Sequence, residues 1–266
     1  MEWTFEASDP VDVDVVVPSG VVEIEASVAG AVSVVLEPMS GRASRAEALI
    51  AESDVSLSSG TLRVHVPNSL SAVRHAAVRC HLRVPEDSAV RVTTASADVS
   101  CAMQIREFSG TSASGDVDLR AVRGDVSLRS ASGDVRCESI GGKLRVRAAS
   151  GDVHVGAVGR DVNVSLASGG LVVADAGGSV DVKTASGDVS VGCARTGTVR
   201  VQSASGDVTV GVASGVGATL DVSSVSGDAT CDLPFEEESP SAAELKIICR
   251  TVSGDVRVRS ATPVST

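Results

Sequence analysis

Residues 112–135 read SASGDVDLRAVRGDVSLRSASGDV, and the hexamer Ser-Ala-Ser-Gly-Asp-Val occurs twice in this stretch, 18 residues apart. The hexamer returns at residues 203–208, and close variants end at Val153 and Val189. Such a motif is compatible with a catalytic device, a metal-binding device or a structural corner. Because self-similarity at a fixed period is the signature of a repeat protein, the spacing is the first property to interpret.

The residue that follows each motif Asp recurs every nine positions and is always apolar through the middle of the chain. The series is Val99, Phe108, Val117, Val126, Val135, Leu144, Val153, Val162, Leu171, Val180 and Val189. The position two residues later is also apolar in every unit except at Gly110, and the residue between them is mostly polar. This period-2 alternation predicts one short strand, with one buried face, for every nine residues.

Two architectures fit short strands at this spacing, an antiparallel meander and a solenoid. The turns distinguish them, because Ser-Gly turns recur every 18 residues, whereas the turns between them vary, as in Arg-Gly-Asp at residues 123–125. Equivalent residues stack in a solenoid, which explains why one edge keeps one sequence and the other does not. The sequence therefore predicts an all-β fold, a single-stranded β-solenoid (parallel β-helix) with about 18 residues per coil.

The repeats divide the chain into two predicted regions. Residues 1–90 do not follow the nine-residue spacing, and we expect them to form a β-rich N-terminal cap, with one helix at residues 44–52 and Ser44 as its N-cap. Residues 91–266 form the predicted solenoid. The segment DLPFEEESPSAAE is rich in proline and acidic residues, so an extruded loop is expected around residues 232–245.

The Ser-Gly-Asp motif has a physical explanation as a corner. Glycine accepts positive φ, and Ser and Asp side chains bond to the backbone groups that a turn exposes. Carboxylates stacked about 4.8 Å apart repel by about 1 kcal/mol in water, so backbone donors and arginines, or else a cation, must offset the repulsion. The predicted structural corner residues are Gly115, Asp116, Gly133, Asp134, Gly151, Asp152, Gly187, Asp188, Gly206, Asp207, Gly227, Asp228, Gly254 and Asp255.

Other chemistry has weaker support. A calcium-binding roll needs paired glycines and an Asp two residues after the last one, whereas Gly and Asp are adjacent here. The four histidines have no metal-ligand spacing, and no nucleophile elbow or phosphate-binding loop occurs. A polysaccharide-active enzyme would need clustered charges in a groove, and the charges here are spread out. We therefore expect no catalytic residue, no cofactor and no metal.

Composition limits the partners and the location. The net charge of −11 predicts no nucleic-acid partner, because no basic patch is expected to be available to neutralise phosphates. The start, MEWTFEASDPVDVDVVV, does not resemble a signal peptide, so a cytoplasmic protein with no membrane insertion is expected. The six cysteines lack CxxC spacing and are interpreted as buried small hydrophobic residues.

The chain resembles a bacterial β-strand-repeat family of unknown function that is commonly labelled "putative adhesin". The resemblance rests on the opening WTF…DPVDVDVVVPSGVVEIEAS, on LRVPEDSAVRVTTASADVS before the repeats, and on the SASGDV series. It implies a mostly parallel β-helix without known catalysis. Gly170 replaces the motif Asp and Ala97 replaces the motif Gly, so the corner stack is not strict.

The function expected from the sequence is that of a non-enzymatic structural or interaction protein, an adhesin-like β-solenoid that presents repeated polar faces to an unknown protein or cell-surface partner. The alternative is a self-assembling filament subunit similar to the cytoskeletal bactofilins, with end-to-end self-association. That alternative predicts a coil end that is uncapped and apolar.

Overall fold

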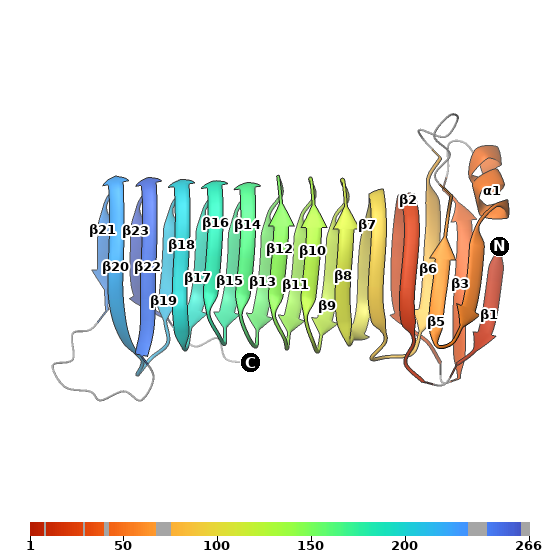
Figure 1. Ribbon diagram of the computed structural model, residues 1–266, viewed down its shortest axis with the longest axis horizontal. Helices are drawn as coiled ribbons and strands as arrows, with labels where there is room; N and C mark the ends of the chain where they lie inside the picture. Colours follow the sequence, from red (N-terminus) through yellow and green to blue (C-terminus); the bar gives the residue numbers. More distant parts are fainter. Residues whose placement is uncertain (8, 29, 40–42, 68–75, 234–243, 262–266) are drawn as a thin grey trace. The chain divides into compact units, whose positions relative to one another are not determined.

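The structure is a computed structural model that describes residues 1–7, 9–28, 30–39, 43–67, 76–233 and 244–261 (Figure 1). Within these residues, the single helix α1 (Ala43–Ala51) accompanies a chain that is otherwise built from β-strands. The chain divides into two compact units, Met1–Arg136 and Cys137–Thr266. β11 (Val135–Ile140) spans the division. The predicted all-β parallel solenoid is confirmed, and the division at residues 90 and 91 stays a prediction.

Each coil of the second unit consists of two strands and two corners. β12 (Leu144–Ala148) pairs in parallel with β14 (Val162–Ser168), so that Leu144 aligns with Val162. β13 (Val153–Val158) pairs in parallel with β15 (Leu171–Ala176), so that Val153 aligns with Leu171. Successive strands therefore alternate between two sheets, and equivalent residues in neighbouring coils are 18 positions apart (Figure 1).

The core lies between the two sheets. The residues that the nine-residue spacing predicts as apolar point inward, and Val153, Val162, Leu171 and Val180 are each at most 1% exposed. Full burial of one Val or Leu side chain stabilises the fold by roughly 1.5–3 kcal/mol. Small aliphatic side chains fill this thin layer, which explains why a chain with 2% aromatic residues still has a continuous core.

The order of the last coils differs from their order in the sequence. In the first sheet the strands follow the order β12, β14, β16 (Val180–Ser186), β18 (Gly197–Ser205), β22 (Glu244–Ser253) and β20 (Gly217–Ser226). In the second sheet the order is β13, β15, β17 (Val189–Ala194), β19 (Val208–Val212), β23 (Val256–Ser260) and β21 (Ala229–Asp232). The coil that comes last in the sequence, β22 with β23, therefore lies between the coil of β18 and β19 and the coil of β20 and β21.

This insertion leaves β20 and β21 as the terminal coil of the unit. Each of the two strands has one partner within the described residues, β22 for β20 and β23 for β21. The loop predicted around residues 232–245 falls largely on residues 234–243, which lie outside the described part of the chain. The spacing of apolar residues in the sequence did not predict this exchange. The same spacing is expected whichever of the two coils lies next to β18 and β19.

In the first unit, two long strands each cross from one sheet to the other. The first halves of β2 (Asp12–Ala26) and β7 (Ala89–Ile105) lie in a sheet ordered β4 (Asp54–Ser58), β5 (Thr61–His65), β2, β7, β8 (Glu107–Ser112) and β10 (Val126–Ser130). The second halves lie in a sheet ordered β1 (Glu2–Glu6), β3 (Ala31–Pro38), β6 (Val78–Val84), β2, β7 and β9 (Val117–Val122). Residues 12–26 therefore form a coil of the parallel ladder, earlier than the spacing indicated.

The predicted N-terminal β cap contains the antiparallel pairs of the molecule. These are β1 with β3, β3 with β6, and β4 with β5. The helix predicted at residues 44–52 is found as α1 at Ala43–Ala51. Ser44 lies inside this helix, so its prediction as the N-cap is wrong.

The cysteines follow the core with one exception. Cys80, Cys101, Cys137, Cys193 and Cys249 are buried, as predicted. Burial raises the pKa of Cys80 and of Cys249 to about 12. Cys231 is exposed, which corrects the prediction, because it lies in β21 of the terminal coil, which pairs only with β23 among the described strands.

Candidate functional site

The repeated Ser-Gly corners form one column along each unit. The corner glycines share a positive φ, between 113° and 144°: Gly115, Gly133, Gly151, Gly169, Gly187, Gly206, Gly227 and Gly254. The column is also tightly packed, because a Cβ built on Gly187 would lie 2.0 Å from the carbonyl oxygen of Gly169. Conformation and close approach therefore both require glycine at this position.

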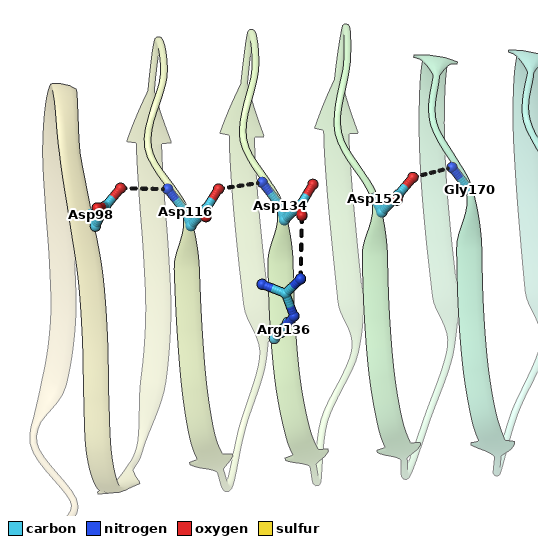
Figure 2. A network of polar contacts seen from close by, with 6 residues as sticks. All are labelled: Asp98, Asp116, Asp134, Arg136, Asp152 and Gly170. Atoms are coloured by element: carbon cyan, nitrogen blue, oxygen red, sulfur yellow. Dashed lines mark hydrogen bonds and ion pairs between the residues drawn. The ribbon is translucent and has the colours of Figure 1, made fainter.

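The motif carboxylates are bound to the backbone of the neighbouring coil. In the first unit, the N–H of Asp116 donates to Asp98 Oδ1 at 3.0 Å, and the N–H of Asp134 donates to Asp116 Oδ1 at 2.8 Å (Figure 2). In the second unit, the N–H of Gly170 donates to Asp152 Oδ1 at 2.7 Å (Figure 2). We call this arrangement the aspartate ladder.

The aspartate ladder continues through the exchanged coils. Asp207 N–H donates to Asp188 Oδ1 at 2.8 Å, and Asp255 N–H donates to Asp207 Oδ1 at 2.9 Å. Asp228 N–H then donates to Asp255 Oδ1 at 2.9 Å. The ladder therefore follows the order in space rather than the order in the sequence.

These bonds supply the compensation that stacked carboxylates need. A hydrogen bond to a charged acceptor contributes roughly 1.5–3 kcal/mol, more than the roughly 1 kcal/mol of repulsion between neighbouring carboxylates in water. Arg136 adds an ion pair to Asp134 at 3.3 Å (Figure 2). In the part of the chain that the structure describes, no group of three or more His, Cys, Asp or Glu side chains is placed to hold a metal ion.

In several motifs the first hydroxyl completes the corner, whereas the buried Thr184 Oγ1 has no hydrogen-bond partner among the described residues. Ser203 Oγ donates to the carbonyl of Ser205 at 3.0 Å, and Thr251 Oγ1 donates to the carbonyl of Ser253 at 3.1 Å. Both hydroxyl-bearing residues are buried. These two hydroxyls therefore donate to backbone carbonyls of the turn itself.

The alternate corners are held by ion pairs instead of a regular ladder. Lys143 Nζ lies 3.0 Å from Asp161 Oδ2, and the hydrogen bond from Lys143 lowers the pKa of Asp161. Arg195 makes two bonds to Asp175, at 2.9 and 2.7 Å. These pairs are exposed and differ from coil to coil, which agrees with the variable sequence of this edge.

A shallow groove lies on the first unit and was not predicted from the sequence. Its volume is about 540 Å³, and charged side chains of β2, β5 and β7 line it, among them Asp14, Arg63 and Arg91. Arg106 also lines the groove but is bonded to Asp12 at 2.7 Å. The groove was missed because strands far apart in the sequence form it. Its charges are of both signs.

The second unit has a cationic surface, although the net charge of the whole chain is −11. Across the first sheet of this unit, the described outward-facing ionic side chains are six cations and two carboxylates. We call this surface the basic face, and its cations are Arg145, Arg147, Lys183, Arg200, Lys246 and Arg250. The interpretation that no basic patch is available is therefore wrong, because folding separates the cations of the faces from the carboxylates of the corners.

The histidines do not assemble into a site. His154 lies on the outer surface of β13, as predicted. His81 pairs with Glu25 at 3.0 Å, which lowers the pKa of Glu25. His75 lies outside the described residues.

Comparison with known proteins agrees with this architecture. A family model described as Toastrack DUF4097 matches residues 55–261. No curated protein matches the chain.

Two solved structures, each described as a "putative adhesin", share the fold. The one from Parabacteroides merdae is 9% identical, with a TM-score of 0.50, and covers 96% of this chain and 95% of its own. The one from Parabacteroides distasonis is 12% identical, with a TM-score of 0.51, and covers 97% of each chain. In a separate finding, no helix among the described residues is long and apolar enough to cross a membrane.

The corner geometry predicts opposite effects for two adjacent glycines. A Cβ on Gly169 would lie 2.1 Å from the carbonyl oxygen of Gly151 at a φ of 120°, whereas the nearest atom to a Cβ on Gly170 is 3.4 Å away. We expect Gly169→Ala to lower the free energy of unfolding by roughly 2–3 kcal/mol, and Gly170→Ala to leave it unchanged or raise it by up to about 1 kcal/mol. Urea unfolding of the two variants measures the difference, and equal midpoints would contradict the corner assignment.

The gap in the aspartate ladder can be filled. Gly170→Asp would place a carboxylate where the N–H of Asp188 can donate to it, as its counterparts do elsewhere in the ladder. We expect the free energy of unfolding to rise by about 1 kcal/mol relative to Gly170→Ala, most clearly at high salt, where carboxylate repulsion is screened. A Gly170→Asp variant less stable than Gly170→Ala at every salt concentration would show that the ladder bonds are not stabilising.

Proposed function

We propose that this chain, which belongs to the Toastrack DUF4097 family, is a non-enzymatic interaction module that presents the flat polar faces of its β-solenoid to a partner. The observation that carries the proposal is the use of the repeated carboxylates. At six rungs the Oδ1 of a motif Asp accepts a backbone N–H of the next coil, so the most conspicuous motif of the chain holds corners together. The outward side chains of the strands are then left for contact with a partner.

The relatives support the same class of function by analogy. The two solved structures are described as putative adhesins, which is a binding role. At 9% and 12% identity the solved structures share the fold with this chain, and a shared fold does not transfer a ligand. The proposal therefore rests on how the polar groups of this chain are used.

A turnover assay tests the absence of catalysis. We expect the full chain to release no product from panels of oligosaccharides and esters, and we expect Asp116→Asn and Asp207→Asn to lower the midpoint of thermal unfolding without creating or abolishing any activity. Mass spectrometry of the substrates after long incubation provides the measurement. Reproducible turnover that either variant abolishes would overturn the proposal and identify the aspartate ladder as catalytic.

A second candidate function, self-assembly through the end of the solenoid, is favoured by the terminal coil. Leu220 of β20 occupies an inward position, and its side chain is 37% exposed, whereas its equivalents Val199 and Ile247 are fully buried. β20 is ten residues long and contains neither proline nor lysine, which commonly protect an exposed edge strand. A second copy has the same cross-section and would cover both edges and the apolar layer between them.

The geometry of this assembly gives a charge-dependent prediction. Asp221, Asp228 and Asp232 of the terminal coil would meet their counterparts, so association should strengthen as salt screens them. We expect sedimentation to show association at raised protein concentration, and Leu220→Lys to remove it. Val172→Lys is the matched control, because Val172 is also partly exposed, at 39%, but lies on β15, which has a partner strand on each side. Monomers at every concentration and salt, or equal effects of both variants, would contradict the assembly.

A further inference from the structure

The basic face contains one row in which cations and neutral hydrogen-bonding side chains alternate. The row runs across the six strands of the first sheet, perpendicular to them. The parallel registers place its members in one line: Arg147, Ser165, Lys183, Gln202, Arg250 and Ser223. A cation therefore occurs at every second rung, with a hydroxyl or an amide between each pair of cations.

The spacing in this row is fixed by the backbone. Neighbouring strands in a sheet are about 4.8 Å apart, so successive cations are separated by about 9.6 Å. Ser165 is half-buried, whereas the three cations and Gln202 are exposed. The only ion pair of the row within the described residues is the 4.0 Å contact between Arg250 and Asp221, and an exposed pair of this length contributes little. The row is thus open to an external anion.

The exchanged coils create this alternation. In sequence order, β20 would follow β18, and Ser223 would lie beside Gln202. The insertion of β22 instead places Arg250 beside Gln202 and moves Ser223 to the end of the row. The third cation thereby keeps the same two-rung spacing as the first two.

We propose that this row binds a linear polysaccharide in which acidic and neutral sugars alternate, one sugar to a rung. A pyranose unit in an extended chain is about as long as one rung is high. Each carboxylate would therefore meet Arg147, Lys183 or Arg250, and each neutral sugar would lie over Ser165, Gln202 or Ser223. The inference rests on the proposed non-enzymatic function and identifies the chemical class of its partner.

The row fits other polyanions less well. Each strand of a nucleic-acid duplex carries one phosphate about every 3.4 Å of helix axis, a charge density that does not match one cation per two rungs. The six strands of the basic face contain no aromatic side chain on which a base could stack. An anionic bilayer offers charge at any spacing, so it would attract the whole basic face and would not select the alternating row.

The experiment measures binding of the full chain to hexasaccharides by calorimetry. The first probe alternates glucuronate with N-acetylglucosamine, the second is hexagalacturonate, which is acidic at every sugar, and the third is the neutral hexamer of N-acetylglucosamine. We expect the alternating probe to bind best, the fully acidic probe less tightly, and the neutral probe not at all. Binding of the alternating probe should weaken with salt, because the contacts are exposed.

Two sets of variants locate the binding. Arg147→Ser, Lys183→Ser and Arg250→Ser together should weaken binding of the alternating probe by about tenfold or more, since exposed charge pairs contribute several-fold each. Arg160→Ser, Arg257→Ser and Arg259→Ser remove the same charge from a corner and from the opposite sheet, and should leave binding unchanged. Similar urea midpoints of the two triple variants would show that folding is preserved.

A third variant separates spacing from total charge. Ser165→Lys combined with Lys183→Ser keeps the composition but shifts the central cation by one rung. We expect it to lose several-fold in affinity for the alternating probe and to gain relative affinity for hexagalacturonate. Equal binding by this variant and the unchanged chain would overturn the assignment of the row.

Competition tests the other classes of partner. Oligothymidylate and vesicles of phosphatidylglycerol in phosphatidylcholine should compete poorly with the alternating probe. Tight binding of either, with no binding of the hexasaccharides, would overturn the proposal. Mass spectrometry of the hexasaccharide in the same samples distinguishes the two levels of inference, because cleavage would overturn the non-enzymatic function, whereas intact but unbound sugar would overturn only the assignment of the ligand.

Discussion

The rest of the structure depends on the close approach of successive coils at the Ser-Gly corner. At Gly187 and its equivalents, the backbone of one coil lies so near the carbonyl of the next that no Cβ can be accommodated. This contact sets the register of the strands that leave the corner, because each begins two residues later, at a buried valine or leucine except at the exposed Ala229 of the terminal coil. Glycine occupies this tightest point at eight corners, with Ala97 as the exception, so the sequence repeats there and can vary elsewhere.

Backbone hydrogen bonds at the same corner offset the repulsion between stacked carboxylates. Stacked carboxylates repel, but each motif Asp with a bonded neighbour receives the N–H that the next corner exposes. The bond serves two groups at once, since it gives the carboxylate a donor and the corner N–H an acceptor. The acidic motif is therefore a part of the backbone bonding scheme.

Folding sorts the charges of the chain into different surfaces. Carboxylates gather along the corners, where the backbone uses them, and arginines and lysines gather on one sheet of the second unit. A net charge of −11 is compatible with a basic face, because the sum does not depend on where the residues lie. Position in space also decides the exposure of apolar residues. Leu220 and Cys231 occupy inward positions of the repeat pattern, and they are exposed because their coil is the last in space.

The amino-acid pattern was sufficient to predict the strands, the 18-residue coil and the corner, because each depends on local alternation and on residue types that recur at fixed spacing. It also placed Cys101, Cys137 and Cys193 in the core, since their positions follow the period of two. It could not determine the exchange of the last two coils, the groove between β2, β5 and β7, or the row from Arg147 to Arg250. These features depend on which coil lies beside which. That order is decided by backbone pairing between distant segments, and the period of the sequence is the same for either order.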